Sequence, residues 1–243
     1  MTGDDTGSRR EALLGMLAGG GLVATSWLAE SRSSAAEKEV ELAKVPKVVI
    51  EAANQVVSEP KWIWASKIID GDKTAYELDG TDALKRDVTV LVTADGKAVE
   101  CETELKVASR VPEGVLKSVH AKWPKFTPTE THQIRRGENL QTHRDGDYVY
   151  DVRGTIAKGR DIQMQVSSTG VILESVVEIL LEKVPPVVMA ALKKERPKFE
   201  VGTAYEMKEE KALIGYHFKG KGPKGRDFTI SVSPDGKQVE VLE

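Results

Sequence analysis

Hydrophobic and polar residues follow two periods along this chain, and both periods recur three times. Apolar residues first fall three or four positions apart, as in Val45, Val49, Ala52 and Val56, and the same helical period returns in residues 111–119 and 184–192. A proline follows the first valine of each stretch, which suits the start of a helix, where a backbone N–H is not needed. Another proline closes each stretch. The pattern predicts three short amphipathic helices.

After each predicted helix the period changes to two. Inward apolar residues now alternate with outward residues. The inward residues are Val88, Val90 and Val92; Ile162, Met164 and Val166; and Phe228, Ile230 and Val232. The outward residues between them are Thr89 and Leu91; Gln163 and Gln165; and Thr229 and Ser231. Strict alternation is typical of strands that pack on one face and meet water on the other. Asp-Gly-Lys at residues 95–97 and 235–237 predicts tight hairpins between strands.

The two periods belong to one repeated unit. A tyrosine, an arginine and a glycine follow one another at intervals of ten residues three times, as Tyr76, Arg86 and Gly96; Tyr150, Arg160 and Gly170; Tyr216, Arg226 and Gly236. Such recurrence is the signature of a tandem repeat. We expect an α+β fold of three tandem repeats, residues 42–105, 109–179 and 181–243. Each would be an α-helix packed on its own four-stranded antiparallel meander sheet.

The N-terminus has the pattern of an export signal. Arg9 and Arg10 precede an apolar, glycine-containing run over residues 13–28, and small residues then lead to a cleavage site ahead of Glu37. The stretch resembles a twin-arginine signal, with Ala12 where phenylalanine is common. Residues 1–36 are therefore predicted to be a signal peptide of a periplasmic or secreted protein. An uncleaved membrane anchor and an ordinary helix are the alternatives.

Charge and cysteine content narrow the classes of function. The net charge of -3 over 243 residues gives no reason to expect nucleic acid as a partner. Residues 37–108 carry ten basic and fifteen acidic side chains, a net of -5, whereas 109–180 and 181–243 have nets of +1 and +2. This asymmetry could steer a charged partner. The single cysteine, Cys101, excludes an intramolecular disulfide and is expected to be a buried thiol.

The order of motifs resembles a known family. The order is Val-Pro, a short helix, Pro-Lys-aromatic, Tyr-x-φ-x-Gly (where φ is an apolar residue), a strand and then Asp-Gly. Together these motifs look like the PepSY-like domain, whose fold is similar to the repeat of beta-lactamase-inhibitory proteins. The resemblance covers residues 42–243. It implies an extracytoplasmic protein without catalytic residues or cofactors. It also implies that the chain binds another protein, such as a protease, and can inhibit it.

Other residues could carry chemistry, but their spacing favours structural roles. The histidines lack zinc-ligand spacing, although His132 and His143 could face each other across a hairpin. The basic stretch 219–226 lacks the context of a phosphate loop. Arg86, Arg160 and Arg226 are expected to cap helix C-termini. No nucleophile, base and orienting group assemble at a recognisable spacing, so we predict neither an enzyme nor a metal protein.

The remaining candidate is the polar face of the sheets, as a surface for protein recognition. Trp64 has no aromatic counterpart in the other repeats, so it could anchor a partner, with a place in the core as the alternative. The candidate binding residues are Trp64, Glu77, Thr89, Leu91, Arg153, Gln163, Gln165, His217, Thr229 and Ser231. The alternative is a structural or envelope-associated repeat protein without a discrete ligand. In either case a membrane is contacted only through an uncleaved signal.

Overall fold

The structure is a computed structural model and describes residues 36–105, 111–137, 140 and 148–242. Arg9, Arg10 and almost all of the predicted signal peptide lie outside these residues, as does His143. Within the described ranges, no helix has both the length and the apolar character to cross a bilayer.

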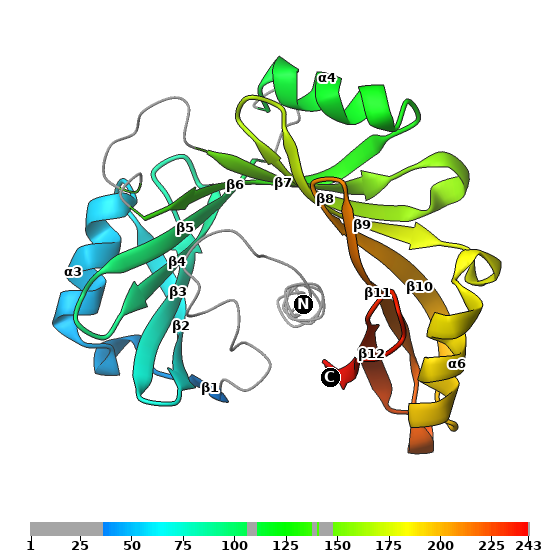
Figure 1. The fold of residues 1–243 in the computed structure, drawn as a ribbon. Coiled ribbons are helices and arrows are strands. Elements are labelled where there is room, and N and C mark those ends of the chain that lie inside the picture. Colours follow the sequence, from blue (N-terminus) through cyan, green and yellow to red (C-terminus); the bar gives the residue numbers. More distant parts are fainter. Residues whose placement is uncertain (1–35, 106–110, 138–139, 141–147, 243) are drawn as a thin grey trace, which may run out of the picture. The chain divides into compact units, whose positions relative to one another are not determined.

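Three α-helices of ten residues each are present in the described chain: α3 (Lys47–Val56), α4 (Glu113–Lys122) and α6 (Pro186–Glu195) (Figure 1). Their positions confirm the helical stripes read from the sequence. Pro46, Pro112 and Pro185 are the N-cap residues, so each lies one position before its helix and not within the first turn, where it was predicted. Single 3-10 turns occur at η1 (Leu42–Lys44), η3 (Ala157–Gly159), η4 (Leu181–Lys183) and η5 (Pro223–Gly225).

The strands form one sheet of thirteen in simple chain order. They are β1 (Ala36–Glu39), β2 (Lys61–Asp70), β3 (Lys73–Thr81), β4 (Asp87–Thr93), β5 (Ala98–Glu104), β6 (Thr127–Arg136), β7 (Val149–Thr155), β8 (Asp161–Ser167), β9 (Ile172–Ile179), β10 (Glu200–Glu209), β11 (Ala212–Lys221), β12 (Asp227–Val232) and β13 (Val239–Val241).

The predicted fold class is therefore wrong: the structure is not three repeats of a helix on a separate four-stranded sheet, because hydrogen bonding does not stop at the expected boundaries. β5 pairs with β6 from Glu100↔Arg136 to Glu104↔His132, and β9 pairs with β10 over residues 174–179. An edge strand leaves a row of backbone N–H and C=O groups unpaired, and here the next strand satisfies them. β1, which was not predicted, extends the sheet beyond β2.

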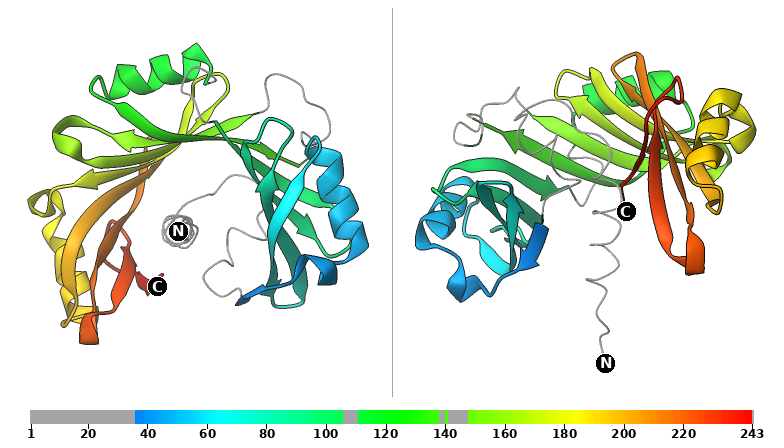
Figure 2. Two further views of the ribbon diagram at one scale, coloured as in Figure 1. Left: turned by 180° about the vertical axis from the view of Figure 1, so that it is seen from behind. Right: turned by 60° about the horizontal axis from the view of Figure 1, so that its bottom comes forward.

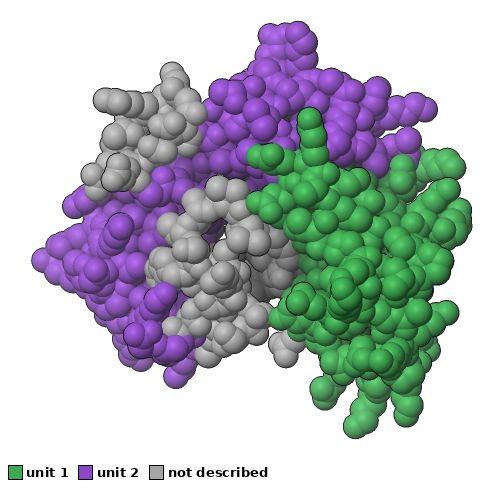
Figure 3. All heavy atoms as spheres, viewed as in Figure 1, with its two compact units in different colours: residues 1–23, 158–163, 174–243 green, residues 24–157, 164–173 purple. Residues whose placement is uncertain are grey.

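The described residues divide into two compact units (Figure 3). Unit 2 takes in the chain up to residue 157 together with 164–173, and unit 1 takes in 158–163 and 174 onwards. In unit 2, α3 lies against β4 and β5, and Figure 2 shows this helix in two further views. In unit 1, α6 lies against β12 and β13. Each helix therefore covers one face of the strands beside it.

The hydrophobic cores lie between these helices and the sheet. In unit 2, Val49 and Val56 of α3 pack in a cluster with Leu78, Val90 and Cys101, all at most 3% exposed. The buried position of Cys101 confirms its expected core role. In unit 1, the corresponding cluster joins α6 to β11 and β12 through Val188, Leu192, Phe218, Ile230 and Val232. Burial of such aliphatic and aromatic side chains stabilises each unit by roughly 1.5–3 kcal/mol per residue.

Glycine is required where two strands approach closely. β6 and β7 change register between Pro128 and Glu130, and Gly154 lies opposite this bulge. A Cβ at Gly154 would overlap the carbonyl oxygen of Thr127 and lie 2.7 Å from Cε2 of Phe126. Gly80 and Gly220 stand at similar positions beside bulges in β2 and β10.

The predicted role of the repeated arginines needs correction. Arg86 binds the carboxylate of Asp82, with Nε 2.7 Å from Oδ2, instead of capping a helix. Arg160 donates to the carbonyl of Glu178 in β9 at 3.3 Å. The side chain that reaches the end of α3 is Arg135, whose Nη2 is 2.7 Å from the carbonyl oxygen of Val56. Alternation along a strand predicts which side of the sheet an arginine faces, but it does not predict which acceptor the arginine binds.

Candidate functional site

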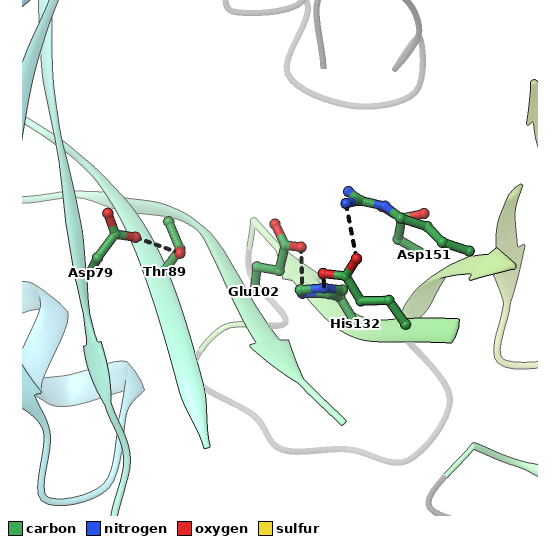
Figure 4. A network of polar contacts seen from close by, with 7 residues as sticks. Asp79, Thr89, Glu102, His132 and Asp151 are labelled. Atoms are coloured by element: carbon green, nitrogen blue, oxygen red, sulfur yellow. Dashed lines mark hydrogen bonds and ion pairs between the residues drawn. The ribbon is translucent and has the colours of Figure 1, made fainter. Parts of the chain in front are cut away.

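The candidate site lies on the face of the unit 2 sheet opposite α3, which we call the helix-free face. Residues directly opposite one another in paired strands point to the same face. The register therefore places one row of side chains across five strands, from Trp64 through Asp79, Thr89 and Glu102 to Ile134. Asp79 accepts a hydrogen bond from Thr89 Oγ1 at 2.6 Å within this row (Figure 4).

His132 of β6 is held between two carboxylates on this face. Its Nδ1 is 2.8 Å from Glu102 Oε1 of β5, and its Nε2 is 2.6 Å from Glu130 Oε1 (Figure 4). Glu130 and His132 are two residues apart in β6, so alternation puts both on the same face. Both ring nitrogens must carry protons to donate to two carboxylates, which fixes His132 as an imidazolium.

The charges of this group reinforce one another. Burial opposes a charge on His132, but the hydrogen bonds and negative charges of Glu102 and Glu130 outweigh it and raise the pKa to about 10. Burial likewise opposes the charge on Glu102, yet the hydrogen bond and positive charge of His132 keep the pKa of its carboxyl below the usual value. The pair is therefore ionised at neutral pH.

Arg153 of β7 extends the network. Its Nη2 is 3.0 Å from Asp151 Oδ2 and its Nη1 is 3.4 Å from Glu130 Oε2. The Nε of Arg153 is buried and has no hydrogen-bond partner. Asp151, whose side chain is 3% exposed, has a raised pKa because burial outweighs the positive charge of Arg153. We call Glu102, Glu130, His132, Asp151 and Arg153 the charged network.

The charged network is poorly suited to acid–base catalysis. A general base needs an unoccupied lone pair and a pKa near the working pH. His132 has neither, since both nitrogens donate and its pKa is about 10. Among the residues that the structure describes, no group of three or more His, Cys, Asp or Glu side chains is placed to hold a metal ion. Fixed, paired charges of this kind can orient and recognise another polar surface.

Acidic side chains outnumber basic ones on the helix-free face. Register and alternation place ten carboxylates there, namely Glu37, Glu39, Glu77, Asp79, Asp87, Glu100, Glu102, Glu104, Glu130 and Asp151. The lysines and arginines on the same face are Lys61, Lys73, Arg136 and Arg153. Ten acidic side chains and four basic ones leave an excess of six acidic groups, or five when the charged His132 is counted. The acidic excess read from residues 37–108 is thus concentrated on one face.

A second polar row crosses unit 1. The register aligns Tyr205 of β10, His217 of β11 and Ser231 of β12. Burial, together with the positive charge of Lys219, lowers the pKa of His217 to about 4, so this imidazole is neutral. The Nζ of Lys219 lies 5.4 Å from the centre of the Tyr205 ring, within the range of a cation–π contact. Among the residues that the structure describes, no carboxylate orients His217, unlike the histidine of a catalytic triad.

The structure places the predicted binding residues in two groups. Trp64, Glu77 and Thr89 are half-buried on the helix-free face of unit 2, where Arg153 is buried in the charged network. Leu91 is buried in a small apolar cluster with Ile68, Ala75 and Val99. His217 and Thr229 of unit 1 are buried, whereas Gln163, Gln165 and Ser231 are half-buried.

Two members of the charged network, Glu102 and Glu130, were not singled out from the sequence. Glu130 could have been found, because it precedes His132 by two residues on a strand and so shares its face. Glu102 lies on a different predicted repeat, and only the pairing of β5 with β6 brings it to His132. The hairpin partner considered for His132, His143, lies outside the described residues.

Comparison with known proteins finds limited likeness. No protein-family profile matches the chain, and no curated protein matches it. A solved structure from Bacteroides eggerthii, described as a candidate periplasmic protein, aligns over 54% of this chain and 87% of its own, with 15% identity and a TM-score of 0.41. A DUF2874 family protein from Bacteroides uniformis aligns over 54% and 87%, with 16% identity and a TM-score of 0.40.

A third structure, a BLIP-like protein from Bacteroides fragilis, aligns over 54% of this chain and 84% of its own, with 16% identity and a TM-score of 0.39. Similarity at this level carries no argument about what the present chain binds. The chain is thus similar in part to BLIP-like and DUF2874 proteins of Bacteroides.

Proposed function

We propose that this chain is an exported, non-catalytic protein that binds another protein through the open polar faces of its strands, the helix-free face of unit 2 among them. Export is supported by the paired Arg9 and Arg10 ahead of an apolar run and small residues. In this proposal each of the sequence repeats, residues 42–105, 109–179 and 181–243, has a polar strand face of its own for binding. The partner is an extracytoplasmic protein, with proteases as the first class to test for inhibition.

The charged network is the observation that carries the proposal. Its five side chains come from three adjacent strands and hold one another at distances of 2.6–3.4 Å. Side chains that are already fixed lose little conformational entropy when a partner binds. Paired charges also discriminate between partners, because a misplaced charge beside them is penalised. A rigid polar surface without a free base suits recognition better than turnover.

The burial of the same side chains also suits the alternative, a structural envelope protein without a discrete ligand. Glu102 and Asp151 are shielded from water, and a shielded network can serve only to fix strand register. The two functions differ in whether the open polar faces meet another protein in the cell.

Site-specific photo-crosslinking separates the two. A photoreactive amino acid at Thr89 reports on the helix-free face of unit 2, and one at Ser231 reports on the polar row of unit 1. The same residue at Lys47 or Val187 reports on the exposed surfaces of α3 and α6. Binding predicts discrete adducts from Thr89 and Ser231 only, which Gln163→Arg should reduce if Gln163 faces the partner. Equal labelling from all four positions, or none from any, would favour the structural alternative.

A further inference from the structure

One corner of the helix-free face combines the features of a site for a cationic side chain. It is formed by β1, β2 and β3, and we call it the Ser66 corner. The register places Ser66 between Glu39 of β1 and Glu77 of β3. Trp64 lies two residues before Ser66 on the same strand, and its cross-strand neighbour is Asp79. Three carboxylates and one indole therefore surround a hydroxyl.

Ser66 itself indicates that a polar group is missing. Its side chain is 0% exposed, and its Oγ has no hydrogen-bond partner. A buried hydroxyl normally bonds to another group, because leaving water without compensation is unfavourable. Because Ser66 is fully buried, the longer side chains around it must move aside before an incoming group can reach its Oγ.

The charge of the corner selects the kind of group that would fit. Six more carboxylates than lysines and arginines lie on this face, so a cation is attracted and an anion is repelled. An ammonium or guanidinium group donates hydrogen bonds, which both the hydroxyl oxygen of Ser66 and the carboxylates can accept. The face of an indole ring is also the best aromatic partner for such a cation.

We propose that the Ser66 corner receives a lysine or arginine side chain of a partner protein with a basic surface. This inference rests on the proposed function and names the chemistry of its partner. The ammonium or guanidinium lies between Glu39 and Glu77, packs against Trp64 and donates to Ser66 Oγ. The acidic face attracts the partner over a distance, and the corner fixes its register.

Binding of a lysine-rich peptide tests the proposal, with the same peptide acetylated on every lysine as the uncharged probe. Affinity is measured by calorimetry at low and moderate salt on the full chain. The expected result is binding of the charged peptide only, with affinity falling as salt rises. Ser66→Ala and Glu77→Gln should each weaken binding by about three- to tenfold.

Matched substitutions outside the Ser66 corner distinguish a specific binding site from general electrostatic attraction to the acidic face. Glu113→Gln removes one exposed carboxylate at the start of α4, and Trp123→Phe removes an indole outside the corner. Both should change affinity by less than about twofold, whereas Trp64→Phe should weaken it clearly. Equal losses in corner and control variants, or equal binding of the acetylated peptide, would overturn the proposal.

Failure of this inference can be distinguished from failure of the proposed function. If crosslinks form from the open polar faces while the charged peptide does not bind, the chain binds a partner of another chemistry and the cationic site is wrong. If neither occurs, the binding function itself is wrong. Ser66→Ala also has an independent readout, since removing an unpartnered buried hydroxyl should leave the urea midpoint unchanged or raise it.

Discussion

Replacement of His132 by glutamine should change how stability depends on pH. The folded pKa of about 10 exceeds the ordinary value of 6.5, because Glu102 and Glu130 hold the proton on the ring. The stabilisation from this proton is complete below pH 6.5 and is lost as pH rises from 6.5 to 10. The difference of 3.5 pH units corresponds to roughly 5 kcal/mol.

His132→Gln removes the cation and leaves Glu102 buried beside Glu130. Removing one partner from a buried ion pair costs about 3–5 kcal/mol. The variant should therefore be less stable than the parent by several kcal/mol at pH 6, and the difference should shrink towards zero near pH 10. His120→Gln, at an exposed position of α4, makes the same replacement outside the charged network and is the matched control.

Local stability is best followed by hydrogen exchange of β5, β6 and β7 in urea, because the two compact units need not unfold together. NMR of the imidazole of His132 gives its pKa directly. A ring that titrates near pH 6.5, or a difference between parent and His132→Gln that is constant from pH 6 to 10, would refute the ion-pair network.

Three further predictions concern other parts of the chain. Gly154→Ala should lower the free energy of unfolding by about 2–4 kcal/mol through its clash with Thr127 and Phe126. Gly114→Ala, in a helix with open space around it, should raise this energy by about 0.5–1 kcal/mol, and urea titration compares the two. Burial raises the pKa of Cys101, so a thiol reagent should modify it only after unfolding, and fast labelling of the native protein would contradict this. Arg9→Lys with Arg10→Lys should retain the precursor in the cytoplasm if export uses the twin-arginine route, whereas unchanged export would exclude that route.

The local elements could be predicted because their periods are written in residues close together in sequence. The stripe that contains Val49 and Val56 gave α3, and the alternation of Val88, Val90 and Val92 gave the buried side of β4. The joining of strands into one sheet could not be predicted in this way. Period tells which face of a strand packs, but it contains no information about which strand lies along each edge.

The candidate site shows the same division. Thr89 and Arg153 were assigned to the helix-free face from alternation alone. The contact of His132 with Glu102 depends on β5 pairing with β6, although thirty residues and a helix separate the two positions. Arg135 was likewise not expected at the end of α3, because its acceptor lies 79 residues earlier in the chain.

The order of the sheet has a consequence for how the protein folds. Every strand pairs with its immediate neighbours in the chain, so the longest connections to close are the helix-containing ones, such as that between β5 and β6. Closing a short loop carries a smaller entropic penalty than closing a long one, and topologies of this kind generally fold quickly. Growth of the sheet could start at any hairpin and spread in both directions. A nascent chain would then expose two sheet edges to aggregation, β1 and the most recently added strand.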